Sequence, residues 1–164
     1  ISWTDALRVA LRPSAPLRTR MRPLRGSHLV LPLRRLPLTR AVTFLHPKDS
    51  RPVFALPWEG AVIFGTTDVD HQTDLQTDPS ISAEEFEYLL TALQHVFPRQ
   101  ELSEADITAT FSGLRPVVDT GKADPSKESR EHAIWDETGL LTVAGGKLRS
   151  EEHTAELQSR QDTS

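Results

Sequence analysis

Between residues 27 and 64 the sequence carries four short apolar runs rich in residues that favour extended backbone. The runs are 27–31, 41–45, 53–56 and 61–64, and Pro, Asp, Ser and Gly separate them. A parallel pair of consecutive strands needs a crossover of about a dozen residues or more, and every connection between these runs is shorter. We therefore expect an antiparallel sheet and exclude a parallel doubly wound sheet here. Trp58-Glu59-Gly60 is the expected hairpin turn.

The clearest helix signal follows these runs. Ser82 and Glu85 have the spacing of a capping box, in which the two side chains cap each other's backbone N–H groups. Apolar residues then recur on one helical face: Phe86, Leu89, Leu90, Leu93 and Phe97. Pro98 cannot continue a helix because it lacks a backbone N–H. The sequence predicts one helix over about 82–97.

Two weaker signals follow the helix. Residues 106–112 predict a strand that Gly113 interrupts. Residues 133–135 and 140–143 predict a second hairpin across a polar turn.

Charge is distributed unevenly, although the net charge is only −4. Residues 1–51 carry eleven Lys and Arg against two acids, whereas residues 52–164 carry eight against twenty-one. Such a basic segment is typical of an arm or tail that binds anions. Within it, residues 1–24 are rich in Arg and Pro, and we interpret them as a connector in which only residues 3–9 favour a helix.

The chain contains no cysteine, which removes several classes of site. Disulfides, thiolate zinc centres, iron–sulfur ligation and cysteine nucleophiles are excluded. The histidines lack the spacing of a metal motif, and we assign no metal site. Uncharged apolar stretches are only a few residues long, so no transmembrane helix is expected.

Two arginines are candidates for anion binding. Arg115 stands before Pro116 near the end of a predicted strand, so the backbone would aim its guanidinium in a fixed direction. Arg130 lies just before the second predicted hairpin. If the two guanidinium groups converge on one ligand, they indicate a phosphate site. The alternative is that each forms a surface salt bridge with a nearby acid.

Lys147 follows Gly145 and Gly146 after the last predicted strand. The glycines allow the backbone to approach a ligand closely, and a lysine there could hold an anion at a helix start. The alternative is an ordinary turn, because the tripeptide lacks the glycine spacing of a phosphate loop and the chain has no G-x-G-x-x-G.

His28 lies in the first apolar run, beside Leu29. An imidazole there could exchange a proton near neutral pH, and the alternative is a half-buried, hydrogen-bonded structural histidine. Residues 65–68, Gly-Thr-Thr-Asp, either cap a loop over a ligand or form a simple turn.

Taken in order, six motifs resemble one family, the FAD-dependent glycerol-3-phosphate dehydrogenases of the respiratory type. The motifs are RGSHLV (25–30), FALPW (54–58), GTTD (65–68), SGLRP (112–116), SRE (129–131) and VAGGKL (143–148). The resemblance covers about residues 24–148.

The resemblance implies an α+β fold: the antiparallel-sheet substrate (cap) domain portion of a two-domain FAD-dependent oxidoreductase, lacking the N-terminal dinucleotide-binding fold. Residues 25–135 would form the substrate-binding sheet region, with the helix at about 82–97. Residues 136–148 would be a returning strand of the FAD domain.

The activity implied is oxidation of sn-glycerol 3-phosphate to dihydroxyacetone phosphate, with a hydride passing to flavin and electrons to quinone. By position, His28 and Lys147 match catalytic residues, and Arg115 and Arg130 match substrate-binding residues. Flavin contacts would come from Gly145, Gly146, Lys147 and Leu148. The parent would be cytoplasmic and peripheral on the membrane surface, and it would have no nucleic-acid partner. Whether the parent forms a homodimer is left open.

The sequence also departs from the family pattern. Arg149-Ser150 replaces the usual Thr-Thr after Gly-Gly-Lys-Leu. Residues 149–159 resemble a translated sequencing-library adapter, and we interpret residues 149–164 as a non-native tail. We therefore expect an internal fragment that neither holds FAD nor turns over alone.

Three alternatives remain beside this interpretation. A glycerol-3-phosphate oxidase would differ only in passing electrons to oxygen. A non-catalytic anion-binding module would use the basic first third of the chain, although few aromatic residues there could stack on bases. The third alternative is an incomplete chain with no function of its own.

Overall fold

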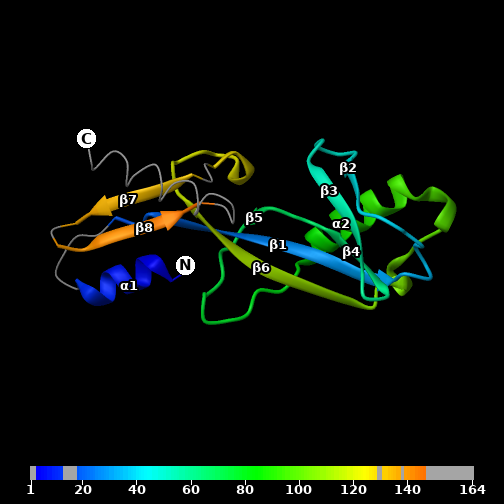
Figure 1. Ribbon diagram of the computed structural model, residues 1–164, viewed down its shortest axis with the longest axis horizontal. Helices are drawn as coiled ribbons and strands as arrows, with labels where there is room; N and C mark the ends of the chain where they lie inside the picture. The colour runs from blue at the N-terminus through cyan, green and yellow to red at the C-terminus, as the bar shows by residue number, and fades with distance from the viewer. Residues whose placement is uncertain (1–2, 13–17, 129–130, 138, 147–164) are drawn as a thin grey trace. The chain divides into compact units, whose positions relative to one another are not determined.

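The computed structural model describes residues 3–12, 18–128, 131–137 and 139–146. Its contacts divide the chain into two compact units. The first unit comprises Ile1–Leu24, Asp70–Leu75 and Arg115–Ser164, and the second comprises Arg25–Val69 and Gln76–Leu114. The long strands β1 (Met21–Pro32) and β6 (Ala109–Val118) contribute residues to both units (Figure 1).

An antiparallel sheet forms the second unit. Strand β2 (Val42–Leu45) pairs with β3 (Pro52–Trp58), β3 pairs with β4 (Ala61–Gly65), and β4 pairs with β1. Strand β1 also pairs with β6 and with the short β5 (Val69–Asp70). The antiparallel arrangement predicted from the short connections is confirmed.

The turn between β3 and β4 is the one that the sequence indicates. Glu59 and Gly60 join the strands with φ angles of 46° and 81°. Two positive φ angles match the twist of a two-residue hairpin, and glycine adopts them without a steric penalty.

Helix α2 (Ala83–Val96) confirms the predicted helix and its start. The Ser82 hydroxyl accepts a hydrogen bond from the Glu85 backbone N–H, and the Glu85 carboxylate accepts one from the Ser82 N–H. The helix ends before Pro98, and a short 3₁₀ turn (Pro98–Gln100) follows. The apolar face of α2 packs on one face of the sheet, and their shared core contains Leu29, Leu31, Val53, Ala55, Val62, Phe64, Leu89, Leu90, Ala92 and Leu93.

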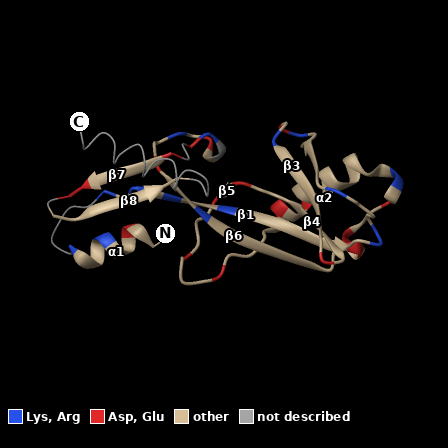
Figure 2. Ribbon diagram, in the orientation of Figure 1, with Lys and Arg blue, Asp and Glu red and all other residues tan. Residues whose placement is uncertain are grey.

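The opposite face of this sheet is open and apolar. Side chains alternate along β3, so Val53 and Ala55 enter the core while Phe54, Leu56 and Trp58 are exposed. Neither β3 nor β4 contains a charged residue (Figure 2). A contiguous apolar surface of this kind is unusual unless it contacts a ligand or another part of a protein.

The first unit contains helix α1 (Thr4–Leu11) and the hairpin of β7 (His132–Asp136) with β8 (Leu141–Gly145). The hairpin confirms the second one predicted. The buried guanidinium of Arg8 donates to Glu137 at 2.8 Å. The Asp5 carboxylate accepts the backbone N–H groups of Arg20 and Met21. Within the described part of the predicted connector, Arg8 is therefore held by a partner 129 positions away.

The predicted interruption of a strand at Gly113 is wrong. Strand β6 begins later than expected, at Ala109, and runs through Gly113 to Val118. Asp106 instead belongs to a 3₁₀ turn, Glu104–Asp106. Pairing with β1 keeps the glycine extended, and a Cβ there would meet nothing within 4 Å. Its position in a strand is thus decided by the partner strand.

A further 3₁₀ turn, η3 (Pro125–Lys127), belongs to the first unit. Across the described ranges, no helix has both the length and the apolar character needed to cross a membrane. Residues 149–164, interpreted above as a non-native tail, lie outside the described residues.

Candidate functional site

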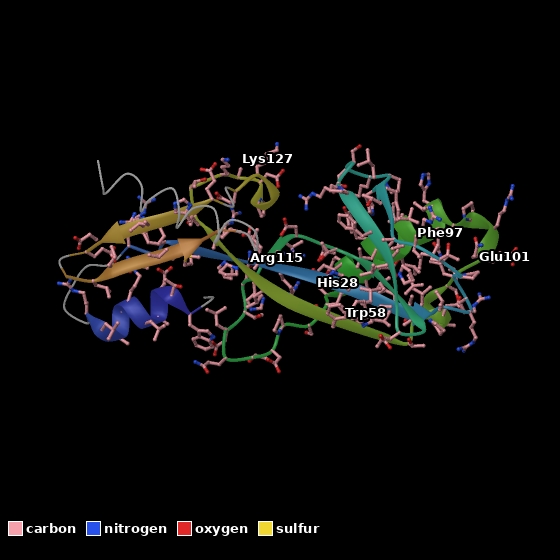
Figure 3. All side chains as sticks on the ribbon, in the orientation of Figure 1. His28, Trp58, Phe97, Glu101, Arg115 and Lys127 are labelled. Atoms are coloured by element: carbon pink, nitrogen blue, oxygen red, sulfur yellow. The ribbon has the colours of Figure 1, made fainter. Side chains whose placement is uncertain are left out.

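His28 lies on β1 in the second unit (Figure 3). Its neighbours Ser27 and Leu29 are fully buried on the side of α2, whereas His28 is half-buried. In the register of the sheet, His28 is opposite Gly65, and Gly65 is opposite the exposed Phe54. Alternation along β1 therefore directs the imidazole to the face that α2 leaves open.

The imidazole lies over Gly65 and against an aromatic ring. A Cβ at residue 65 would lie 2.6 Å from Cδ2 of His28, a separation that real Cβ atoms do not reach. On the neighbouring strand β6, the ring of Phe111 stacks on His28 with 4.6 Å between centroids and 10° between planes. The absent side chain at Gly65 and the stacked Phe111 together define where the His28 ring lies.

A buried carboxylate lies on the other side of the sheet. Glu85 has a relative exposure of 4%, and its Oε1 accepts hydrogen bonds from the hydroxyls of Ser27 at 2.9 Å and Thr67 at 2.6 Å. Its Oε2 accepts the Ser82 N–H at 3.0 Å and forms an ion pair with Arg25 at 2.6 Å. Both oxygens of this carboxylate are thus occupied by donors.

These donors decide the protonation state of Glu85. Burial by itself raises the pKa of the carboxyl, because it disfavours the charged form. Hydrogen bonds from Thr67, Ser82, Arg25 and Ser27 favour the ionised form and outweigh burial, so the pKa of Glu85 lies below its ordinary value. Glu85 is therefore a carboxylate at neutral pH.

The predicted capping box did not reveal this second role of Glu85. Thr67 belongs to the Gly-Thr-Thr-Asp segment, and its Oγ1 accepts the Ser27 N–H at 2.9 Å while donating to Glu85. Ser27 also shares a hydrogen bond of 2.8 Å with the Ser112 hydroxyl. The signal available in the sequence was the hydroxyl residues Ser27 and Ser112 within strands and Thr67 in the segment that follows β4.

The other predicted site residues belong to the first unit or lie outside the described residues. Arg115 is half-buried on β6 within the first unit (Figure 3). Arg130, Lys147 and Leu148 lie outside the described ranges. The structure thus leaves the predicted convergence of Arg115 and Arg130 as a prediction.

Gly145 and Gly146, at the end of β8, both have positive φ angles, of 82° and 85°. A Cβ on Gly145 would lie 2.4 Å from the Glu131 carbonyl oxygen, so the strand end requires glycine. Within the described residues, a Cβ on Gly146 would meet nothing within 4 Å, so that part of the chain leaves room for a group beside this backbone.

A second buried carboxylate organises the first unit. The side chain of Glu128 is fully buried and accepts hydrogen bonds from Thr120 and from the backbone N–H of Lys122. Arg22 joins it to Asp70, with 3.0 Å to Glu128 and 2.5 Å to Asp70. Burial raises the pKa of Glu128, but these donors lower it overall. An open pocket of about 460 Å³ lies beside Arg22.

The arrangement around His28 suits proton exchange with a ligand on the open face. An imidazole is a group that can accept or donate a proton in a reaction. The exposed side chains of Phe54, Leu56 and Trp58 lie on the same face of the sheet.

Comparisons with known proteins bear on this chain's relationships. The profile of the family described as FAD dependent oxidoreductase matches residues 2–148. The aerobic glycerol-3-phosphate dehydrogenase of Staphylococcus haemolyticus is 40% identical over 136 residues, which is 82% of this chain and 24% of that protein. The protein of the same name from Staphylococcus aureus strain USA300 is 36% identical over 155 residues, 94% of this chain and 27% of that protein. The chain spans about a quarter of the length of these relatives.

Solved structures agree with this relationship. The glycerol-3-phosphate dehydrogenase from Bacillus halodurans, determined in complex with FAD, matches 98% of this chain and 31% of its own with a TM-score of 0.75 and 30% identity. Glycine oxidase from Bacillus cereus matches 86% of this chain and 36% of its own with a TM-score of 0.51 and 18% identity, which shows a shared fold. The family expected from the six motifs is thereby confirmed: this chain belongs to the FAD-dependent oxidoreductases and is homologous to glycerol-3-phosphate dehydrogenase.

Proposed function

We propose that this chain is the substrate-facing part of an FAD-dependent glycerol-3-phosphate dehydrogenase that oxidises sn-glycerol 3-phosphate to dihydroxyacetone phosphate. The observation that carries the proposal is His28 on an apolar open sheet face, in a chain 40% identical to an aerobic glycerol-3-phosphate dehydrogenase. A proton acceptor and a flat apolar surface are what oxidation of a carbinol beside a planar cofactor requires.

The end of β8 in the first unit is compatible with a group that approaches the backbone closely. Among the described residues, a Cβ built on Gly146 would meet nothing within 4 Å. Gly145, Gly146, Lys147 and Leu148 are the residues that would contact FAD. When bound, FAD supplies a hydride acceptor for the substrate carbon.

His28 would act as the base. As the carbinol carbon loses its hydride, the hydroxyl must lose its proton, and the imidazole of His28 accepts that proton. The products are then the ketone, the imidazolium and the two-electron-reduced acceptor, which balances atoms and charge. Phe111 and Gly65 support this role because they fix the plane of the ring.

Three cationic residues would bind the charged parts of the substrate. The guanidinium groups of Arg115 and Arg130 suit bidentate binding of the phosphate. Lys147 would stabilise the negative charge that develops on the reacting oxygen or on the reduced cofactor. Tests of these roles are separable, because losing a phosphate ligand raises KM whereas losing Lys147 lowers kcat.

The complete protein would pass its electrons to a quinone and lie peripherally on the cytoplasmic face of the membrane. The chain by itself would not hold FAD, since it corresponds to about a quarter of its relatives.

The test is a chimera in which the matching segment of the Staphylococcus haemolyticus relative is replaced by that of this chain. Under anaerobic conditions, glycerol 3-phosphate should bleach the bound flavin and form dihydroxyacetone phosphate, and glycerol should not. His28→Asn should slow bleaching by about 100-fold or more, as expected for loss of a general base. His95→Asn, at an exposed position of α2, is the matched control.

An FAD-loaded chimera that glycerol 3-phosphate does not bleach would contradict the proposed activity. Equal bleaching rates in the His28 and His95 variants would contradict the role of His28. Reoxidation of the reduced chimera by a quinone, compared with oxygen, distinguishes a dehydrogenase from an oxidase.

A further inference from the structure

Two adjacent residues of β1, Ser27 and His28, point to opposite faces of the sheet, and each is held by its own contacts. Ser27 points toward α2 and is fully buried, and His28 points to the open face. On β6 the same arrangement recurs, since Ser112 bonds to Ser27 and its neighbour Phe111 stacks on His28. A polar pair on one side of the sheet and a ring pair on the other therefore hold the same two dipeptides together.

The two oxygens of Glu85 have separate partners. Oε2 accepts the Ser82 N–H and faces Arg25, which completes the start of α2. Oε1 accepts the hydroxyls of Ser27 and Thr67 and takes no part in capping the helix. A capping glutamate needs only the first set of contacts. The second set therefore requires another explanation.

The second set of contacts fixes the backbone that carries His28. The Thr67 hydroxyl, oriented by Glu85, accepts the Ser27 N–H, and the Thr67 N–H donates to the Ser27 carbonyl at 3.3 Å. Ser27 thus has its N–H, its carbonyl and its hydroxyl all engaged. Because the residue before His28 is held at three points, the direction of the His28 Cα–Cβ bond is held as well.

We propose that Glu85 is a positioning residue which, through Thr67 and Ser27, fixes the His28 imidazole against Phe111 for proton transfer. This inference deepens the proposed function and rests on it for the meaning of His28. It assigns to a helix-capping carboxylate a role on the opposite face of the sheet. The Glu85 carboxylate contacts Ser27, Thr67, Ser82 and Arg25, and it acts on the ring only through other residues.

Two matched pairs of variants in the full 164-residue chain test the inference. Thr67→Val removes the hydroxyl at nearly constant shape, and Thr67→Ser keeps it. Glu85→Gln places an NH₂ group against donors, whereas Glu84→Gln makes the same charge change at the neighbouring exposed residue of the same helical turn. The readout is NMR of the His28 ring: its nuclear Overhauser contacts with the Phe111 ring and its titration curve.

The expected result is loss of the His28–Phe111 ring contacts and a changed His28 titration in Thr67→Val and Glu85→Gln. Thr67→Ser and Glu84→Gln should retain the wild-type signals. If a folded Thr67→Val chain keeps the ring contacts and titration of the wild type, the inference is wrong. That variant decides the outcome even if Glu85→Gln does not fold.

A kinetic readout separates this inference from the proposed function. In the FAD-loaded chimera, Thr67→Val should lower kcat by about 10- to 100-fold, since a small misplacement of a reacting group has effects of this size. KM should change by no more than about twofold, because no substrate contact is lost. Disrupted ring contacts in a chimera with no activity toward glycerol 3-phosphate would refute the proposed function and leave the positioning role intact. Unchanged kcat in Thr67→Val would refute the positioning role alone.

Discussion

At the scale of single residues, two glycines have different reasons to be glycine. Gly145 has a positive φ and lies against the Glu131 carbonyl, so both its backbone and its surroundings exclude a side chain. Gly65 lies in a strand, and what excludes a side chain there is the ring of His28 together with the Ser27 carbonyl. Gly65 is thus tied to the position of the candidate base.

Replacing Gly65 by alanine should therefore displace the His28 ring. The added Cβ would lie 2.6 Å from Cδ2 of His28 and 2.9 Å from the Ser27 carbonyl oxygen, and the second of these atoms is backbone. Overpacking of this kind lowers the free energy of unfolding by about 1–3 kcal/mol. Urea unfolding measures the loss, and NMR of the His28 and Phe111 rings measures the displacement.

The matched control is Gly113→Ala in β6, where an added Cβ meets nothing within 4 Å. Alanine has fewer backbone conformations than glycine in the unfolded chain, so folding loses less conformational entropy. This variant should therefore be as stable as the wild type or more stable by up to about 1 kcal/mol. Equal destabilisation by the two substitutions would show that contact with His28 is not the cause.

At the scale of elements, the first turn of α2 is both a locally encoded helix start and a source of contacts to the strand that carries His28. Its capping box is encoded by two residues three positions apart, whereas its packing depends on strands distant in sequence. The same first turn supplies Glu85 to Ser27 and Thr67. The start of this helix therefore contributes both to helix stability and to the order of β1.

Ser82→Ala should separate these two contributions. It removes the hydroxyl that accepts the Glu85 N–H, which should lower the free energy of unfolding by about 1 kcal/mol. The contacts of Glu85 Oε1 with Ser27 and Thr67 stay in place, so the His28–Phe111 ring contacts should persist. Chemical denaturation and NMR give the two readouts.

Ser80→Ala, two residues earlier and exposed, is the control and should change stability by less than about 0.5 kcal/mol. Loss of the ring contacts in Ser82→Ala would mean that helix capping and ring positioning are one function.

At the scale of the whole molecule, each unit contains a buried carboxylate that organises several segments. Glu85 does so in the second unit and Glu128 in the first. For both, burial raises the pKa, but hydrogen-bond donors outweigh it and the net pKa lies below the ordinary 4.5. The hydrogen bond from Arg35 likewise lowers the pKa of Asp106, to about 2 from an ordinary 3.8.

These lowered pKa values predict destabilisation by acid. A carboxyl group with a lower pKa in the folded state binds protons more readily when unfolded. Its contribution to stability is complete above the ordinary pKa, about 4.5 for glutamate, and is lost as the pH falls through the folded-state value. Thermal unfolding between pH 7 and pH 2.5 should show a falling midpoint below about pH 4.5.

Glu85→Gln should flatten part of this dependence, because it removes one of the groups that titrate. Glu87→Gln, exposed on the same helix, is the control that should retain the wild-type slope. A midpoint that is constant across this pH range would contradict the pKa directions given above.

The proposal that the chain holds no FAD by itself is also a statement about the whole molecule. The purified 164-residue chain should be colourless, and added FAD should keep its free fluorescence. The chimera with the Staphylococcus haemolyticus relative should be yellow after gel filtration. A flavin-loaded preparation of the isolated chain would contradict the proposal.

The sequence by itself determined the features that depend on neighbouring residues. Short connections between β-rich runs require antiparallel pairing, the Ser82–Glu85 spacing starts α2, and Glu59-Gly60 forms the hairpin turn. Each follows from backbone geometry and hydrogen bonding within a few positions. The motif series also indicated the family correctly.

Only the tertiary structure decided which distant groups meet. Glu85 bonds to Ser27 across 58 positions, Arg8 bonds to Glu137 across 129, and β1 keeps Gly113 within a strand. A hydroxyl or a carboxylate has the same local signature whether it faces water or a buried partner. The candidate base was visible in the sequence as His28, but its support on both faces of the sheet comes from three other segments brought together by folding, which contain Gly65 and Thr67, Glu85, and Phe111.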